Sequence, residues 1–125
     1  MIVVGGGPTG FLTALGLARA GIDVTLLEAE AGIAHSPRAM VYHAAVLDGL
    51  DQLGVLEDAE RIGFLSGRLQ IRVFGSGECF DFDLATVAGI EGRPKNLHLG
   101  QDKLAELALS HLQRHPNARV CFDTR

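Results

Sequence analysis

The chain has 125 residues, of which 47% are hydrophobic and 21% are charged, and its net charge is −4. This composition is that of an ordinary globular domain, and it excludes a disordered chain and a basic nucleic-acid-binding protein. The length allows one domain with a real core at most. Cys79 and Cys121 form no C-x-x-C pair, so we expect reduced thiols in a cytoplasmic protein and no disulfide framework.

The apolar N-terminus predicts neither a targeting segment nor a membrane span. It lacks the basic region that begins a signal peptide, and its glycines fall at motif spacing. Arg19, Asp23 and Glu28 interrupt the apolar stretches, so none approaches the ~20 uncharged residues that cross a bilayer.

The first 28 residues predict a β-α-β unit. The β-branched run 2–4 is typical of a buried parallel strand and ends in the turn Gly5-Gly6-Gly7-Pro8. Residues 9–20 are apolar or small all round, which predicts a buried helix that stops at Gly21. Residues 22–27 predict a second strand, and a right-handed crossover places the two strands side by side and parallel.

Beyond this unit, helical and extended patterns follow one another. Leucines at 47, 50 and 53 have helical spacing, as do Leu104, Leu107, Ala108 and Leu112. In chain order, we expect a loop over 29–38, a helix from residue 39 to Gly54, another turn or two over 56–62, an extended piece over 96–99, a helix over 102–114 and a last strand over 118–122.

A β-hairpin is predicted between these segments, because residues 68–74 and 80–84 alternate strictly and flank Gly75-Ser76-Gly77. We expect Ser76-Gly77 to form a two-residue loop. That register sets Ile71 opposite Phe82, Val73 opposite Phe80 and Arg72 opposite Asp81.

Gly5, Gly7 and Gly10 form the pattern G-x-G-x-x-G directly after a strand and at the start of a helix. Gly5 allows the tight turn, Gly7 lets the backbone approach a pyrophosphate, and Gly10 lets helix and strand pack closely. The first helical turn, with Pro8 and Thr9, presents its N–H groups and the positive end of the helix dipole to that anion.

Glu28 falls 18 residues after Gly10, at the tip of the second strand. A carboxylate there accepts hydrogen bonds from the two hydroxyls of an adenosine ribose and repels a 2′-phosphate, so the site disfavours NADP. The alternative is that the glycines only make a turn and that Glu28 is a solvated strand end.

Three segments resemble those of known flavoproteins. The run from Gly5 to Glu28 resembles the N-terminal fingerprint of the glutathione-reductase-type FAD-binding fold. Ser36-Pro37-Arg38-Ala39, and Leu99-Gly100-Gln101 with Leu104, resemble the class A flavin monooxygenases, the aromatic-ring hydroxylases. The resemblance implies an incomplete α/β, Rossmann-like FAD-binding fold with an antiparallel hairpin inserted over 64–99.

In that family an arginine after the second strand and a glutamine at the start of a later helix approach the bound FAD. These roles fall on Arg38 and Gln101. Pro37 fixes its own φ, which suits an Arg38 side chain held toward the pyrophosphate or the ribityl chain, and Gln101 offers both a donor and an acceptor. The alternative is an exposed arginine and a helix-leading glutamine.

The resemblance implies an FAD-dependent monooxygenase in which NAD(P)H reduces the flavin and O2 supplies an oxygen atom to an aromatic or related small molecule. No residue here is expected to be a catalytic acid or base, and a homodimer is left open. The family's Asp-Gly and Gly-Asp motifs lie beyond the third strand of the cofactor domain. We therefore expect residues 1–125 to be the N-terminal part of the FAD-binding domain of a longer chain, inactive alone.

Two other function classes stay open. One is another FAD-dependent oxidoreductase on the same fold, a dehydrogenase, reductase or halogenase. The other is a non-catalytic NAD-binding Rossmann module.

Four histidines are candidates for a functional site. His111 and His115 have the spacing of metal ligands on a helix, but no third ligand accompanies them, which favours a role at the negative helix end and no metal site. His35 and His43 flank the Ser36-Pro37-Arg38-Ala39 segment and could approach cofactor or substrate, although position alone favours surface residues.

Overall fold

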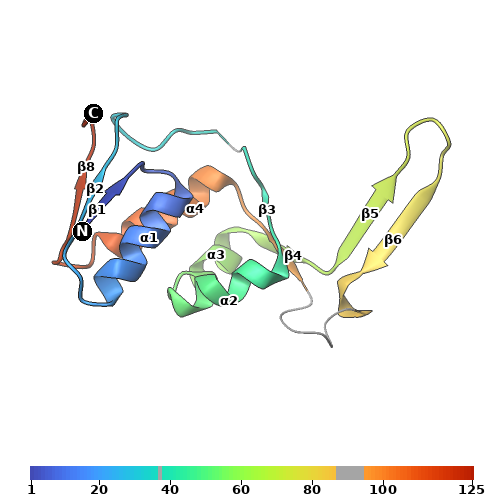
Figure 1. The fold of residues 1–125 in the computed structure, drawn as a ribbon. Coiled ribbons are helices and arrows are strands. Elements are labelled where there is room, and N and C mark those ends of the chain that lie inside the picture. The colour runs from blue at the N-terminus through green and yellow to red at the C-terminus, as the bar shows by residue number, and fades with distance from the viewer. Residues whose placement is uncertain (37, 87–94) are drawn as a thin grey trace.

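The computed structural model of the protein describes residues 1–36, 38–86 and 95–125, and it shows a mixed α/β fold (Figure 1). A parallel sheet stands at one end, and two helices pack beside it. A second sheet, which is antiparallel, follows with two shorter helices, and a hairpin projects from the other end. Pro37 and the part of the expected insertion over 87–94 lie outside the described residues.

The parallel sheet confirms the predicted β-α-β unit. It contains β1 (Ile2–Val4), β2 (Val24–Leu27) and β8 (Ala118–Cys121) in the order β1-β2-β8, and both pairings are parallel. The expected burial of the first strand is wrong for Ile2 and Val4, which are 67% and 81% exposed. The reason is that β1 lies at the sheet edge, where the described residues supply a neighbouring strand on one side only.

Helix α1 (Pro8–Arg19) follows the glycine turn. The expectation that it is buried all round holds for one face only, which consists of Phe11, Ala14, Leu15 and Ala18. It ends as predicted at Gly21, whose φ is +77°. The Gly21 N–H donates to Ala18 and the Ile22 N–H to Leu17, both at 3.0 Å, which is the Schellman pattern that a left-handed glycine makes possible.

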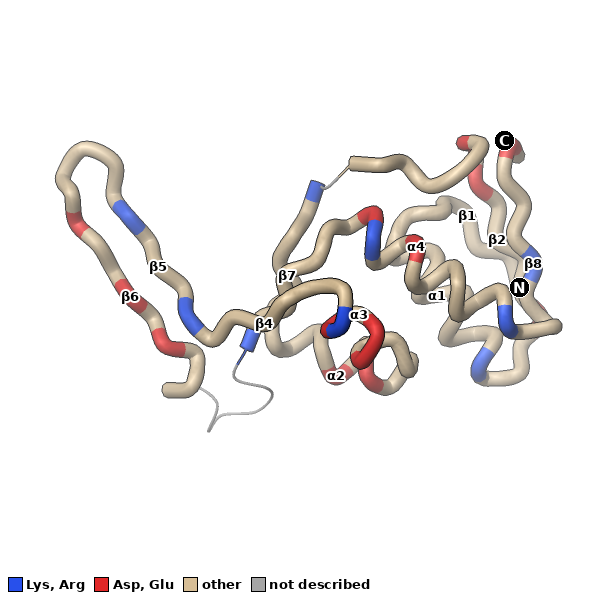
Figure 2. Tube along the Cα trace, turned by 180° about the vertical axis from the view of Figure 1, so that it is seen from behind, with Lys and Arg blue, Asp and Glu red and all other residues tan. Residues whose placement is uncertain are grey.

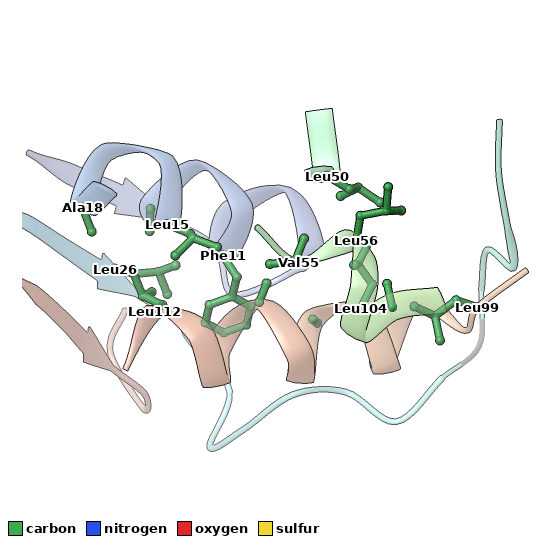
Figure 3. Packing of buried hydrophobic residues seen from close by; sticks show 14 of the residues in the cluster. Phe11, Leu15, Ala18, Leu26, Leu50, Val55, Leu56, Leu99, Leu104 and Leu112 are labelled. Carbon is green, nitrogen blue, oxygen red and sulfur yellow. The ribbon is translucent and has the colours of Figure 1, made fainter. Parts of the chain in front are cut away.

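Helix α4 (Gln101–Leu112) lies alongside α1 and closes the core. Figure 3 shows side chains of α1, β2 and α4 meeting there, with Val55 and Leu56 extending the cluster. The predicted apolar face is confirmed for Leu104, Ala108 and Leu112, all buried, whereas Leu107 is only partly buried.

The second sheet contains two strands that the sequence pattern did not reveal. β7 (Asn96–His98) lies between β3 (Val41–Tyr42) and β4 (Phe64–Ser66), and both pairings are antiparallel. Because β3 occupies residues 41–42, the leucine-patterned helix α2 (Ala44–Gln52) begins later than residue 39. The next helix, α3 (Leu56–Ile62), has the predicted bounds.

The hairpin is present as β5 (Arg68–Arg72) and β6 (Cys79–Asp83), but the predicted register is wrong. Ile71 faces Phe80, and Arg72 faces Cys79 instead of Asp81. The Val73 N–H donates to the Glu78 carbonyl at 2.9 Å, so residues 74–77 form a four-residue loop.

Glycine positions explain this loop. Gly75 and Gly77 have φ of +101° and +76°, whereas a two-residue Ser76-Gly77 loop of the usual hairpin type would need a positive φ at serine. The shift of two residues keeps every side chain on its expected face. Basic residues lie on β5 and acidic residues on β6 (Figure 2), and Arg68 faces Asp83.

Candidate functional site

A cavity of about 140 Å3 lies where β2 ends and where α1 and α4 begin. This is below the ~300 to 1,000 Å3 of a pocket that encloses a drug-sized ligand, so the described residues offer a groove for part of a larger molecule. The lining residues are Gly6, Gly7, Pro8, Glu28, Glu30, Gly32, Ile33, Ala34, Ser36, Arg38, Gln101, Asp102 and Ala105.

The glycine turn between β1 and α1 has the three properties that the motif predicts. Gly5 has φ +103°, and its N–H donates to the Leu27 carbonyl at 2.8 Å, which ties the turn to β2. A Cβ at Gly10 would lie 1.9 Å from the Gly5 carbonyl oxygen, so only glycine allows this contact between helix and turn. A Cβ at Gly7 would meet nothing within 4 Å, so the Gly7 backbone faces open space at the cavity.

The first turn of α1 is free to receive an anion. Its N-cap residue is Gly7, and among the described residues no side chain caps this end. Pro8 occupies the first helical position, and no acidic side chain lies in the first turn. The N–H groups that begin a helix have no partner within it, so those of Thr9 and Gly10 suit a phosphate.

Glu28 is held by two backbone N–H groups. One carboxylate oxygen accepts from the Gly6 N–H and the other from the Glu30 N–H, the latter at 2.9 Å. These two bonds, that from Glu30 first and that from Gly6 second, lower the pKa of Glu28 from its ordinary value. The side chain is therefore an oriented carboxylate whose remaining lone pairs accept hydrogen bonds from a ligand.

Gly6 is a site residue that the sequence reasoning missed. Its position inside the glycine motif was the available signal. A Cβ there would lie 2.8 Å from a Glu28 carboxylate oxygen, so glycine is needed for Glu28 to fold back over the turn.

Arg38 and Gln101 lie far apart in the sequence, and the fold brings them to the same cavity. The Leu99 N–H donates to the Met40 carbonyl and the Gln101 N–H to the Ala39 carbonyl, each at 2.9 Å. These bonds continue the β3–β7 pairing, so the two segments leave the sheet side by side. Arg38 is the one cationic side chain among the described residues that line the cavity.

The predicted site residues thus fall into two groups. Gly7, Pro8, Glu28, Arg38 and Gln101 line the cavity, whereas Gly5, Thr9 and Gly10 shape the turn and the first helical turn behind it.

The other lining residues were missed for a physical reason. Glu30, Gly32, Ile33 and Ala34 belong to a segment without periodicity, so no pattern could mark them, and Ser36 entered the sequence reasoning only as part of the segment that contains Arg38. Asp102 and Ala105 follow Gln101 on α4, and their place in the predicted helix 102–114, directly after Gln101, was the only signal for them.

The candidate histidines lie elsewhere. His35 Nδ1 is 3.5 Å from a Glu106 carboxylate oxygen, and His43 is the N-cap residue of α2. His111 Nε2 lies 2.8 Å from Asp58 Oδ2 and joins α4 to α3. In the described part of the chain, no three His, Cys, Asp or Glu side chains gather as metal ligands would, and no helix is long and apolar enough to cross a membrane.

Comparison with known proteins adds an independent finding. The family model described as FAD binding domain matches residues 1–125. The chain is 46% identical over 124 residues to 6-hydroxy-3-succinoylpyridine 3-monooxygenase HspB of Pseudomonas putida (strain DSM 28022 / S16), covering 99% of this chain and 32% of that protein. It is 36% identical over 126 residues to para-nitrophenol 4-monooxygenase of Pseudomonas sp. (strain WBC-3), covering 100% of this chain and 31% of that protein.

A solved structure agrees with these relatives. The crystal structure of p-nitrophenol 4-monooxygenase PnpA from Pseudomonas putida DLL-E4 matches with a TM-score of 0.91 at 36% identity, covering 98% of this chain and 31% of that one. The chain spans about a third of the length of the curated relatives that it matches.

Proposed function

Because this chain belongs to the FAD binding domain family, we propose that its cavity binds the ADP part of FAD within an NAD(P)H-dependent monooxygenase that hydroxylates an aromatic or related small molecule. The observation that carries the proposal is the oriented Glu28 carboxylate beside the open start of α1, in a cavity that also holds Arg38 and Gln101.

Each residue has a role in the proposed complex. Glu28 accepts hydrogen bonds from the ribose hydroxyls of adenosine, and the N–H groups of the first α1 turn receive the pyrophosphate. Arg38 supplies the positive charge that the cavity otherwise lacks, since its other charged lining residues, Glu28, Glu30 and Asp102, are acidic. Gln101 offers its amide to the hydroxyls of the ribityl chain.

The topology of the described residues supports a fold assignment as part of this proposal. We assign residues 1–125 to the N-terminal part of a Rossmann-like FAD-binding domain of the glutathione-reductase type, with residues 64–99 as a hairpin insertion. Its support is the parallel β1-β2-β8 sheet with its glycine turn, together with the antiparallel β5–β6 pair.

The chemistry divides between the cofactor and the chain. Bound FAD supplies the acceptance of hydride from NAD(P)H and the activation of O2. The residues of this chain bind and orient the cofactor, and none of the proposed site residues has to transfer a proton.

The names of two relatives support a proposal for the substrate class. Two of them are named for oxygenation of an aromatic ring that carries a hydroxyl group, p-nitrophenol and 6-hydroxy-3-succinoylpyridine. We therefore propose a hydroxylated aromatic ring as the substrate of the present protein, with O2 as co-substrate.

Cofactor binding is tested by titrating the flavin-free full-length protein that contains residues 1–125 with FAD and following flavin fluorescence. Arg38→Ala and Gln101→Ala should each raise the dissociation constant about tenfold or more, as the loss of a charged or buried hydrogen bond does. Arg114→Ala and Gln113→Ala, changes at exposed residues at the other end of α4, are the matched controls and should change it less than about twofold. Purified protein without a flavin spectrum that binds NAD instead would refute the proposal.

Turnover is tested with the FAD-loaded full-length protein that contains residues 1–125, with NADH or NADPH, and with p-nitrophenol or 6-hydroxy-3-succinoylpyridine. The aromatic compound should stimulate NAD(P)H oxidation and yield an oxygenated product, whereas nitrobenzene, which lacks the hydroxyl, should do neither. Oxidation that is unaffected by either compound, without oxygenated product, would instead indicate a dehydrogenase, reductase or halogenase on the same fold.

A further inference from the structure

Asn96 is the one polar side chain in the buried core of the described residues, and it is 8% exposed. It lies on β7, the central strand of the second sheet, where it pairs with Ser66 of β4. Its Oδ1 accepts a hydrogen bond from the Ala44 N–H at 3.2 Å. This hydrogen bond joins two segments of the chain that lie 52 residues apart in sequence.

This hydrogen bond caps helix α2 from outside the helix. Ala44 is the first residue of α2, and the N-cap residue His43 provides no side-chain cap of its own. The N–H groups at the start of a helix need a partner from elsewhere, and a side-chain oxygen is the usual one. Asn96 supplies that oxygen from β7, so the start of α2 is fixed to the central strand.

The strand between the cavity and this cap is β3. It contains only Val41 and Tyr42, and the backbone hydrogen bonds from Leu99 to Met40 and from Gln101 to Ala39 extend its pairing with β7 toward the cavity. Arg38 stands three residues before β3, and α2 begins two residues after it. Gln101 stands three residues after β7, which carries Asn96. The Asn96 bond therefore anchors the far end of the paired segments that carry Arg38 and Gln101 at the near end.

We propose that Asn96 is a positioning residue for the cofactor site: by capping α2 it holds the end of β3 remote from the cavity on β7, and so helps to keep Arg38 beside Gln101. This inference rests on the proposed function of Arg38 and Gln101 in binding FAD. Asn96 itself touches neither the cavity nor, in the proposed complex, the cofactor.

The test compares variants of the full-length protein by FAD titration and by thermal unfolding. Asn96→Ala removes the acceptor and should raise the FAD dissociation constant about tenfold, the usual factor for a lost buried hydrogen bond. Asn96→Asp keeps an acceptor oxygen at a helix start, where a negative charge is favourable, and should restore affinity to within about threefold of the wild type.

The matched control is Asn117→Ala. The Asn117 side chain also bonds the backbone: its Nδ2 donates to the Ala18 and Ile22 carbonyls at 3.0 and 3.1 Å, at the end of α1 that is remote from the cavity. It should lower the melting temperature while changing FAD affinity less than about twofold. Where Asn96→Ala does not fold, Asn96→Leu, which fills the site without an acceptor, takes its place in every comparison.

A double-mutant cycle with Arg38→Ala then separates positioning from general stability. If Asn96 acts through the Arg38 segment, Asn96→Ala should weaken binding by less than about threefold once Arg38 is already alanine. Four outcomes would each overturn the inference. Two are wild-type FAD affinity in Asn96→Ala and an equal loss of affinity in Asn117→Ala. The others are no rescue of affinity by Asn96→Asp, and losses in Asn96→Ala and Arg38→Ala that multiply fully in the double variant. If Arg38→Ala itself binds FAD like the wild type, the proposed function of Arg38 fails instead.

Discussion

Replacement of Gly10 by alanine tests whether the first helix is packed against the glycine turn as closely as the structure indicates. The new Cβ would lie 1.9 Å from the Gly5 carbonyl oxygen and 3.0 Å from the Gly5 carbonyl carbon. Both atoms are backbone, so the start of α1 has to move away from the turn. Such overpacking costs ~1 to 3 kcal/mol, and the better helix propensity of alanine recovers up to ~1 kcal/mol. We expect a net loss of about 2 kcal/mol, toward the upper end because no side chain can move aside.

Gly16→Ala is the matched control in the same helix. Its Cβ would lie 3.4 Å from Leu53 Cδ2, an ordinary contact, so the change should stabilise the protein by ~0.5 to 1 kcal/mol. Urea unfolding of both variants gives the two changes in the free energy of unfolding. Each change follows from the shift in urea midpoint, provided that the dependence of this free energy on urea concentration has the same slope as in the wild type. If Gly10→Ala were as stable as Gly16→Ala, the contact between turn and helix would not be the reason for glycine at position 10.

Three further predictions use the same assays. Hydrogen bonds from the Glu30 and Gly6 N–H groups hold the pKa of Glu28 below the ordinary 4.5, so the FAD affinity of the wild type should stay constant as the pH falls toward 4.5 and decline only below it. Glu28→Gln should bind FAD about tenfold more weakly at pH 7. A wild-type affinity that already declines at pH 6 would contradict this reasoning. The hydrogen bond with His111 lowers the pKa of Asp58, and Arg61 lowers it further. The ionised carboxylate therefore stabilises the fold at neutral pH, and this stabilisation is lost as the pH falls through the lowered pKa. Asp58→Asn should make the urea midpoints at pH 7 and pH 3 differ less than they do in the wild type. Gly21→Ala should destabilise by ~1 to 2 kcal/mol because φ is +77° there, whereas Gly49→Ala, inside α2 with open space around it, should not destabilise at all.

The sequence alone predicted the part of the site that neighbouring residues determine. The glycine turn, α1 and Glu28 lie within 28 residues, and each motif position is restricted by local backbone geometry, such as the positive φ of Gly5. The carboxylate was expected at the tip of β2, and the structure places it there. Its two backbone hydrogen bonds were not predicted, because they depend on how the segment after β2 turns back.

The rest depended on pairing between distant segments, which periodicity does not report. β3 and β4 have two and three residues, too few to show alternation, and both pair with β7 far along the chain. The hairpin register failed for a similar reason: strict alternation fixes the face of each side chain but leaves shifts of two residues open. The positive φ values of Gly75 and Gly77 decided the loop.

The two halves of the proposed site are held together mainly by helix packing. Gly7 begins α1, Gly100 precedes α4, and the cavity lies between these two helix starts. Ala14 on α1 and Ala105 and Ala108 on α4 are fully or almost fully buried, and their small side chains let the two helices approach closely. Ala105 also lines the cavity, so the residue that sets helix spacing is itself part of the groove wall. The distance between the glycine turn before α1 and the Gln101 amide is therefore set by core side-chain volume, because neither half can shift without opening the α1–α4 contact.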